Sequence, residues 1–312
     1  MVDRTIRAKP FIKWAGGKTQ LLDQFVNYYP RELKEGKIRN YIEPFLGSGA
    51  VFLHIVQQYQ IESAYLFDVN RDLILTYLVI QQRPEDLLTV LEQYQKNYEG
   101  TPLEKRRELF LAVRQEFNRN RTLMSPPYHK VPSDNWIARA AQFIFLNKTC
   151  YNGLFRLNSK GEFNVPYGRY DKPRICDPTN IYAVARALRK AEIHYGIYSD
   201  CFNLVTADSF VYFDPPYRPI SQTANFTTYT GTEFTDKEQL ELAKFFRKLD
   251  QTKGAKLMLS NSDPKNENPQ DNFFEEVFCG YNIFRVHAAR AVNSKSTKRG
   301  KIHELLITNY DP

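Results

Sequence analysis

Short apolar segments alternate with helical patterns along most of the chain, and this alternation constrains the fold more than any other feature. An apolar run of four to eight residues, rich in β-branched and aromatic side chains, is typical of a buried strand. Strands that alternate with helices form parallel sheets with helices packed on both faces. We therefore predict an α/β fold with a doubly wound, mostly parallel, seven-stranded sheet, with strands over 40–45, 64–68, 192–198, 210–213, 255–260, 281–288 and 303–309.

The segments between these strands predict the rest of the architecture. The last two strands are joined by a loop without a helix, so we expect them to be antiparallel. Residues 80–175 break the alternation, because helical patterns there lead into a polar segment rich in Gly, Asn and Arg. We predict a catalytic domain formed by residues 1–79 and 176–312 and an inserted helical domain formed by residues 80–175. The predicted helices cover 50–58, 70–79, 178–191 and 236–249 in the first domain and 84–98, 102–118 and 136–146 in the second.

The composition favours a polyanionic partner. Lys and Arg number 43 against 35 acidic residues among 312, a net charge of +8, which favours nucleic acid ahead of an anionic membrane. No apolar run approaches the roughly 20 residues of a membrane span, and the first residues lack the apolar stretch of a signal peptide. The 4 cysteines are widely spaced and the 5 histidines do not cluster with them. We expect reduced thiols, a cytoplasmic location and no metal site.

A glycine-rich segment near the start resembles a phosphate-binding loop only superficially. Gly17-Lys18-Thr19 matches the end of a P-loop motif, but that motif needs a glycine five positions before Gly17. Ile12 stands there and no strand precedes it. The sequence therefore excludes a P-loop nucleotide hydrolase.

A second glycine-bearing segment predicts a cofactor site. Glu43-Pro-Phe-Leu-Gly-Ser-Gly49 follows a predicted strand and opens a helix, so the backbone can approach a ligand closely. A dinucleotide fingerprint would need a third glycine where Phe52 stands. Asp68 ends the next strand, 21 residues after Gly47, where a carboxylate can bind ribose hydroxyls. A nucleoside with a short charged tail, such as S-adenosylmethionine, fits this pattern, although an ordinary tight turn and a surface Asp stay open.

The tetrapeptide Asp214-Pro215-Pro216-Tyr217 follows the buried run 210–213 and predicts amine chemistry. An exocyclic base amine is a poor nucleophile because its lone pair is delocalised into the ring. If the Asp214 carboxylate and the Pro215 carbonyl both accept its N–H groups, the nitrogen moves towards tetrahedral geometry. The prolines fix the turn, and Tyr217 offers a face for stacking. A second Pro-Pro-Tyr, at 126–128, has no acid and no preceding strand, so we interpret it as a loop.

Taken together, three motifs, at 14–18, 43–49 and 214–217, resemble those of the Dam-type (D12 class, α-group) N6-adenine DNA methyltransferases. The order of cofactor motifs, recognition domain and catalytic tetrapeptide also matches. The resemblance covers nearly the whole chain. It implies the fold of a class I methyltransferase that uses S-adenosylmethionine, with a helical target-recognition domain carrying a β-hairpin. Further matching segments are 146–148, 151–156, 161–170, 223–229 and 259–262.

The resemblance also implies roles for individual residues. Asp214 and Tyr217 would hold the target adenine, with Pro215 and Pro216 completing the catalytic motif. Asp200 corresponds to an acid that often lies near the adenine ring of the cofactor. Positions that read the bases of GATC correspond to Lys13, Leu154, Arg156 and Tyr170. The cofactor-binding set is Trp14, Ala15, Gly17, Lys18, Glu43, Pro44, Phe45, Gly47, Gly49, Asp68, Asp200 and Asp214.

The expected activity is methyl transfer from S-adenosylmethionine to the N6 amine of a flipped-out adenine in duplex DNA, within GATC. Alternatives are an adenine methyltransferase of different sequence specificity and a non-catalytic DNA-binding regulator that senses the cofactor. Methyltransferases of RNA or of protein glutamine commonly have Asn where Asp214 stands. We expect a monomer associated with the nucleoid. Partnership with a cognate restriction endonuclease and a solitary role are both left open.

Overall fold

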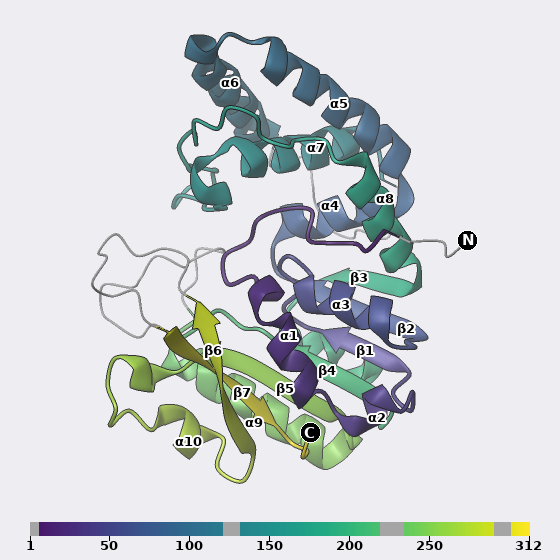
Figure 1. Ribbon diagram of the computed structural model, residues 1–312, viewed down its shortest axis with the longest axis vertical. Coiled ribbons are helices and arrows are strands. Elements are labelled where there is room, and N and C mark those ends of the chain that lie inside the picture. Colours follow the sequence, from purple (N-terminus) through teal and green to yellow (C-terminus); the bar gives the residue numbers. More distant parts are fainter. Residues whose placement is uncertain (1–5, 121–131, 219–233, 290–300) are drawn as a thin grey trace.

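A seven-stranded mixed sheet forms the centre of the molecule in the described residues (Figure 1). The computed structural model describes residues 6–120, 132–218, 234–289 and 301–312. The strand order is β3-β2-β1-β4-β5-β7-β6, which confirms the predicted α/β class. The strands are β1 (Asn40–Glu43), β2 (Ser63–Asp68), β3 (Ala191–Tyr195), β4 (Ser209–Phe213), β5 (Lys256–Ser262), β6 (Asn282–Ala289) and β7 (Lys301–Thr308).

The direction of each strand follows from its connection. β1 pairs in parallel with both β2 and β4, and β2–β3 and β4–β5 are also parallel. β7 runs antiparallel between β5 and β6, as expected for a final pair joined without a helix. The chain leaves β1 in one direction through β2 and β3, and the later strands build outward from β4 on the other side. β1 and β4 therefore flank the point at which the strand order reverses.

Both faces of the sheet are buried. Along β4, Phe210 and Tyr212 belong to one hydrophobic core, whereas Val211 and Phe213 belong to the other. Successive side chains of a strand point to opposite faces, so a continuous apolar run is required when helices cover both. The sequence 209–213 meets this requirement without a polar interruption beyond Ser209, which is itself buried.

Helices cover the two faces in the three-layer arrangement of a doubly wound fold. The first core includes side chains from the helices before β4, and the second from those after it. The helices are α1 (Leu22–Phe25), α2 (Arg31–Lys34), α3 (Ala50–Gln58), α4 (Arg71–Gln82), α5 (Pro84–Gly100), α6 (Arg106–Arg119), α7 (Asp134–Thr149), α8 (Pro178–Ala187), α9 (Asp236–Lys253) and α10 (Phe273–Val277).

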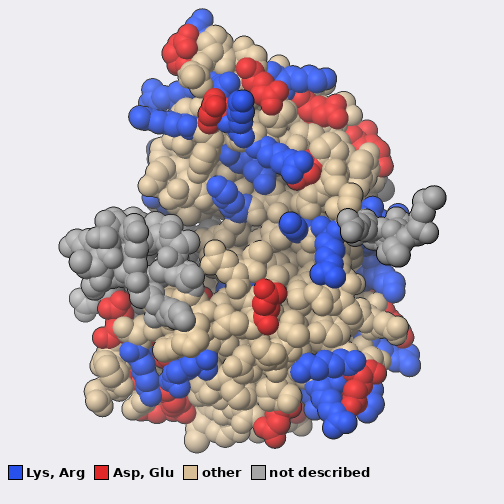
Figure 2. Space-filling model, in the orientation of Figure 1, with Lys and Arg blue, Asp and Glu red and all other residues tan. Residues whose placement is uncertain are grey.

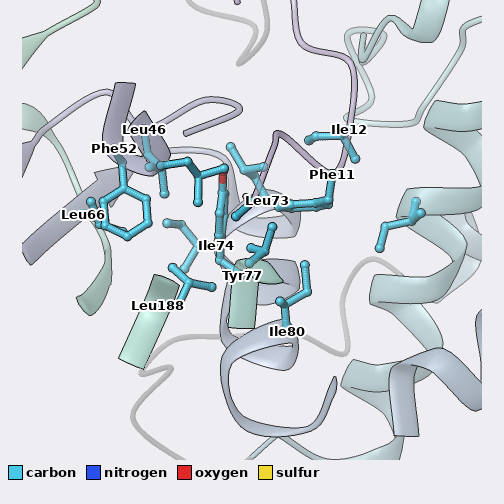
Figure 3. Close-up of a cluster of buried hydrophobic side chains, with 14 of the residues drawn as sticks. Phe11, Ile12, Leu46, Phe52, Leu66, Leu73, Ile74, Tyr77, Ile80 and Leu188 are labelled. Atoms are coloured by element: carbon cyan, nitrogen blue, oxygen red, sulfur yellow. The ribbon is translucent and has the colours of Figure 1, made fainter. Parts of the chain in front are cut away.

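Part of the first core is built on α4 (Figure 3). Phe11 and Ile12 of the N-terminal segment lie beside this helix, and the ring of Phe11 meets that of Tyr77 edge-on at 5.0 Å. The helix begins where the Asn70 side chain accepts a hydrogen bond from the Leu73 amide at 3.0 Å. Such a cap satisfies one of the amides that a helix start leaves unpaired.

The helical part of the molecule, α5 to α7, lies above the sheet in Figure 1 and comes between β2 and β3 in the chain. A buried ion pair joins it to α4, the helix that packs against β2 and β3. In this pair the Arg139 guanidinium of α7 donates to both oxygens of Asp72 in α4, at 2.5 and 3.1 Å. α4 continues to Gln82 and packs against α7 as well as β2 and β3. The two-domain division with boundaries at 79/80 and 175/176 stays a prediction.

Strand and helix predictions differ from the structure mainly at their ends. β3 stops at Tyr195 instead of residue 198, because Gly196 turns the chain and the Asp200 carboxylate accepts from the Ile197 amide at 2.9 Å. The helix predicted over 178–191 ends at Ala187 and continues as a 3-10 turn. The predicted loop at 126–128 and the motif segment at 223–229 lie outside the described residues.

Candidate active site

The carboxyl ends of β1, β2 and β4 meet at one edge of the sheet, beside the point at which the strand order reverses. Ligands of doubly wound folds bind at such an edge. Glu43 ends β1, Asp68 ends β2 and Asp214 follows β4, so three carboxyl groups predicted from separate motifs come together there. The parallel pairing of these strands brings the groups to the same edge.

The Asp214 carboxylate is fixed by a cation and a hydroxyl. The Lys18 ammonium lies 2.7 Å from each of its oxygens, and Ser260 Oγ donates to Oδ1 at 3.0 Å. Lys18 is buried, with 3% of its surface exposed, and its ammonium also donates to the Gly16 carbonyl. The same ammonium lies 4.7 Å from the centre of the Tyr217 ring. The Lys18 ammonium therefore contacts both the Asp214 carboxylate and the Tyr217 ring of the Asp-Pro-Pro-Tyr loop.

The rest of this loop is held by side chains from more distant elements. Gln239 of α9 donates to the Pro216 carbonyl at 3.0 Å. Tyr217 donates its hydroxyl to Glu304 of β7 at 2.5 Å. Pro215 also carries a main-chain carbonyl oxygen, which can accept hydrogen bonds. The loop thus keeps one carboxylate and one main-chain acceptor beside an aromatic ring whose hydroxyl is anchored.

Burial sets the electrostatics of this edge. It raises the pKa of Asp214 above the ordinary value, although the charge of Lys18 and hydrogen bonds from Lys18 and Ser260 act against it. Glu43, with 2% of its surface exposed, accepts from the Tyr41 hydroxyl at 2.6 Å. Burial raises the pKa of Glu43 well above its usual range, and the nearby Asp214 charge adds to the effect. Lys18 is the cation that partly offsets both carboxylates.

The loop after β1 is held against the end of β2 by Asp68. One carboxylate oxygen of Asp68 accepts from the Gly47 amide at 2.9 Å and the other from the Asn70 amide at 2.7 Å. Burial raises the pKa of Asp68 to about 6, and these amide bonds oppose the shift. Gly47 has φ +49, and a Cβ there would lie 3.0 Å from Cδ1 of Trp14. Glycine at this position lets the indole of Trp14 lie directly on the loop.

The other predicted cofactor residues lie in the segments 14–18 and 43–49, except for Asp200. Gly17 donates its amide to the Trp14 carbonyl at 3.2 Å and turns the chain towards Lys18. Phe45 stacks on Tyr198 at 5.6 Å, so an aromatic pair borders the edge. Asp200 is the exception, because its carboxylate caps the turn after β3. The remaining members are exposed Ala15, buried Pro44 and Gly49, which precedes α3 with φ +66.

Comparisons with known proteins agree with this geometry. The family model of the D12 class N6 adenine-specific DNA methyltransferases matches residues 14–292. The chain is 46% identical to the type II methyltransferase M.MjaIII of Methanocaldococcus jannaschii, over 98% of this chain and 100% of that protein. It is 34% identical to M1.LlaDCHI of Lactococcus lactis subsp. cremoris, over 98% and 96%. It is 32% identical to the DNA adenine methylase of Escherichia coli K12, over 97% and 96%.

The chain belongs to the D12 class of N6-adenine-specific DNA methyltransferases. The expected family, fold class and enzyme class are therefore confirmed. The conclusion rests on a match over most of the chain together with relatives above 30% identity across nearly their whole length.

In this methyltransferase the segment after α7 forms a hairpin-like loop. Antiparallel bridges join Cys150 to Tyr167 and Leu157 to Phe163, and the amide of Asn158 donates to the Glu162 carbonyl at 2.8 Å near the turn. Two residues of the loop adopt positive φ, 56° at Asn152 and 58° at Arg169. The short 3-10 turn η5 (Tyr151–Gly153) begins it and presents Tyr151 with 54% of its surface exposed.

The four predicted base-reading residues are all solvent-accessible, on two segments of the methyltransferase. The Lys13 ammonium lies 5.0 Å from the centre of the Tyr170 ring. Leu154 is 37% exposed, and Arg156 donates from Nε to Asn164 Oδ1 at 2.7 Å, which leaves its remaining N–H groups to other partners. A Cβ at Gly153 would lie 2.6 Å from the Lys13 side chain, so glycine allows the N-terminal segment to pack on the hairpin.

Three contributors to the site were given no role by the sequence, although two of them, Phe155 and Ser260, lie in segments that match the family. Phe155, between two predicted readers, is 5% exposed and stacks on Trp14 at 5.9 Å. Ser260 and Glu304 reach the Asp-Pro-Pro-Tyr loop from strands 46 and 87 residues further along the chain. Sequence spacing cannot relate such distant residues, and only the strand order brings them together. Trp14 packs on Gly47 and stacks on Phe155, so it connects the loop after β1 to the hairpin.

The surface of the methyltransferase suits a polyanion on the face shown in Figure 2, where several Lys and Arg side chains lie over the helical part and beside the N-terminal segment. Among the described residues there is no group of three or more His, Cys, Asp or Glu side chains that could hold a metal ion. No helix in the described ranges is long and apolar enough to cross a membrane.

Proposed function

We propose that the enzyme transfers a methyl group from S-adenosylmethionine to the N6 amine of a flipped-out adenine within GATC in duplex DNA. The observation that carries the proposal is the Asp214 carboxylate at the tip of β4, beside the Tyr217 ring and next to the edge formed by β1 and β2. An acceptor pair and a stacking surface at that edge suit an exocyclic amine of a planar base.

The residues of the edge fit S-adenosylmethionine as the donor. Asp68 ends β2 with one oxygen on the Gly47 amide of the glycine loop and the other on the Asn70 amide, and a carboxylate oxygen has a further lone pair for a ribose hydroxyl. Trp14 and Phe45 supply aromatic surface for a purine, and Lys18 supplies a cation for a carboxylate tail. The bound donor supplies a methyl group on a sulfonium, and the electron pair of the broken carbon–sulfur bond stays on sulfur.

Asp214 and Pro215 would activate the target amine. Their oxygens accept its two N–H groups, which moves the nitrogen lone pair out of conjugation with the ring. The carboxylate then faces the positive charge that develops on nitrogen as the new bond forms. Lys18 lies 2.7 Å from both Asp214 oxygens, and each oxygen keeps a further lone pair that can accept an N–H group of the amine. The excess N6 proton leaves to water after transfer.

Tyr217 would receive the extruded base. Rotating an adenine out of a duplex costs a few kcal/mol in lost stacking and pairing. Stacking on an aromatic ring recovers about 1–3 kcal/mol. The hydrogen bond from the Tyr217 hydroxyl to Glu304 fixes the orientation of that ring before the base arrives. Part of the rate enhancement would then come from the alignment of amine and methyl group.

The hairpin and the N-terminal segment would read the sequence. Arg156 has free guanidinium N–H groups for O6 and N7 of a guanine, and Leu154 exposes an apolar side chain that can contact a thymine methyl. Lys13 and Tyr170 are already in contact with each other and would act as one unit at the other end of the site. The support for GATC is the match of these four positions to those of the Dam-type enzymes.

The test is methylation of a defined duplex. Tritiated S-adenosylmethionine is supplied with a duplex that contains one GATC and with duplexes in which each base pair of the site is replaced in turn. Label on N6-methyladenine in the GATC duplex alone supports the full proposal. Equal or greater label on another sequence would support N6-adenine methylation but would show that GATC is not the preferred site. Binding of duplex and donor without transfer would favour a regulator.

We also propose that the enzyme works as a cytoplasmic monomer on nucleoid DNA. Two relatives are named as type II methyltransferases, which supports a role beside a restriction endonuclease that cuts the same site. Relatives named DNA adenine methylases support a solitary role. Sequencing of modified bases in cells that express the chain with and without its genomic neighbours separates the two.

A further inference from the structure

A cavity of about 300 Å³ lies away from the Asp214 edge, between the N-terminal segment, α7 and the start of α8. Its polar lining is unusually cationic, with Arg7, Lys9, Lys148 and Arg174 against one acid, Asp177. Apolar side chains, among them Phe11, form the rest of the wall. The volume is at the lower end of the range for small-molecule sites and is ample for a phosphate or a diphosphate.

The one acid does not neutralise these cations. Asp177 pairs with Arg174 at 3.2 Å and also caps α8 through a bond from the Asn180 amide. No carboxylate among the described residues lies within 4.0 Å of the charged groups of Arg7, Lys9 or Lys148. Three positive charges at one cavity repel one another, and this cost is removed when an anion binds between them.

The position of Lys148 points to the same chemistry. It is half-buried at the end of α7, and burial lowers its pKa, with the charges of Lys13 and Arg174 acting in the same direction and Asp177 against them. A lysine held where its charge is disfavoured is available to an incoming anion. The N-terminal end of α8, a helix of 10 residues, lies at the cavity and adds the partial positive charge of the helix dipole, although Pro178 has no N–H group and the Asn180 amide bonds Asp177.

We propose that this cavity is a binding site for a phosphate group, held by Arg7, Lys9 and Lys148. The phosphate comes either from the DNA backbone beyond the recognition hairpin or from a small free phosphate compound. A backbone source is within reach, because residues 9 to 13 extend at most about 14 Å along the chain. The Asn147 side chain, adjacent to Lys148, bonds both the amide and the carbonyl of Lys13.

The experiment uses the full chain, pyrophosphate as the small probe and a 20-base-pair duplex as the DNA probe. The main variant is Arg7→Gln with Lys9→Gln, since both side chains are exposed and their loss should leave the melting temperature unchanged. Lys148→Gln is the second variant. Arg189→Gln with Lys34→Gln is the matched control for the double variant, because it removes two charges from exposed side chains outside the cavity, and Arg189→Gln alone is the control for Lys148→Gln.

Calorimetry with pyrophosphate should show binding to the wild type and the controls, and about tenfold weaker binding to the variants. For the duplex, the slope of log K against log salt should fall by about 0.9 for each lost phosphate contact. A change in slope, with or without pyrophosphate binding, assigns the site to the DNA backbone. Pyrophosphate binding with an unchanged slope assigns it to a small compound.

The proposal is overturned if the wild type does not bind pyrophosphate and the variants keep the salt slope of their controls. Both measurements record binding, so they give an answer whether or not GATC is the methylated sequence. The backbone source alone rests on the proposed function, and a nonspecific duplex of the same length tests that arm independently of specificity.

Discussion

The Asp-Pro-Pro-Tyr loop and the recognition hairpin are both irregular segments, but they are held in different ways. The catalytic loop accepts hydrogen bonds from Lys18, Ser260 and Gln239 and donates one to Glu304, and these partners come from four separate parts of the chain. The hairpin is held partly by its own side chains, such as Asn158, whose side-chain amide and carbonyl groups bond residues 160 and 162. It is also held by side chains of the helical part, such as Asn118 of α6, which bonds both the amide and the carbonyl of Phe163. Isolated bridges and a few main-chain hydrogen bonds connect its two arms.

This contrast separates the residues proposed for catalysis from those proposed to recognise the DNA sequence. A buried network of polar groups fixes acceptor atoms to within tenths of an ångström, which amine activation requires. The hairpin is anchored on the helical part, so its exposed side chains can change without disturbing the sheet. We expect substitutions in the loop at 214–217 to abolish turnover, and substitutions at exposed hairpin positions to alter which sequence is methylated. Five predictions test this division, starting with the largest effect.

Asp214→Ala should reduce the methylation rate by a factor of about 10³ or more, because the main acceptor of the amine is lost. Duplex affinity should change less than threefold. Asp214→Asn is the matched control, since it keeps one acceptor oxygen and should retain more activity than the alanine variant. Single-turnover kinetics and a filter-binding assay measure the two quantities. Turnover of Asp214→Ala at the wild-type rate would remove this carboxylate from the mechanism.

Asp68→Asn should weaken the binding of S-adenosylmethionine by about 1.5–3 kcal/mol, because a hydrogen bond to a charged acceptor is lost. Wild-type affinity should also fall as the pH is lowered through about 6, where the carboxyl takes up a proton. Calorimetry between pH 5 and 8 measures both effects. A variant with the same pH profile as the wild type would exclude Asp68 as the titrating group.

The same pKa gives a stability prediction of known sign. The native Asp68 carboxyl binds a proton below about pH 6, whereas the unfolded one does so only near 3.8. The native state therefore holds more protons in this window, and the contribution of Asp68 to the free energy of unfolding rises as the pH falls through it. Urea denaturation of the wild type and Asp68→Asn at pH 7 and pH 5 should show the difference.

Arg156→Ala should relax discrimination at one guanine of the site by about 1–3 kcal/mol and leave turnover on the preferred duplex nearly intact. Lys160→Ala, at the exposed turn of the same hairpin, controls for the loss of charge and should weaken binding to all sequences alike. Rates on a panel of substituted duplexes give the comparison. If the panel ranks the duplexes identically for wild type and Arg156→Ala, another residue reads that guanine.

Phe155→Leu should have the smallest effect, since exchanging one apolar core side chain for another of similar size typically costs less than about 1.5 kcal/mol. Its consequence should be specific, because Phe155 is the hairpin ring that stacks on Trp14. Phe163→Leu is the matched control, a buried ring that packs on Phe155 and Phe117. We expect similar losses in melting temperature, but reduced affinity for S-adenosylmethionine only in Phe155→Leu. Equal affinity in both variants would show that the stack has no such role.

Much of the fold could be predicted because local pattern and tertiary structure agree. The helix predicted over 50–58 has those bounds, and the apolar run 210–213 is a strand buried on both faces. The end of β3 could not be predicted, because it depends on a hydrogen bond from the Ile197 amide to Asp200. Among the site residues, Asp214 and Asp68 follow from strand ends, whereas Lys18, Trp14 and the base readers came only from resemblance. The contacts of these residues join distant positions, as in the pair of Lys18 with Asp214, 196 residues apart.

The antiparallel course of β7 has a consequence for how the enzyme is made. β7 is the last of the seven strands in sequence but lies between β5 and β6, and Glu304 stands near its beginning, opposite Ser262. During synthesis on the ribosome, β6 has no neighbour in the sheet and Tyr217 has no acceptor until residues 301–308 have emerged. A nascent chain therefore completes its catalytic pocket only after β7 has emerged, and a ribosome stalled before that point holds a chain whose sheet and catalytic loop are incomplete.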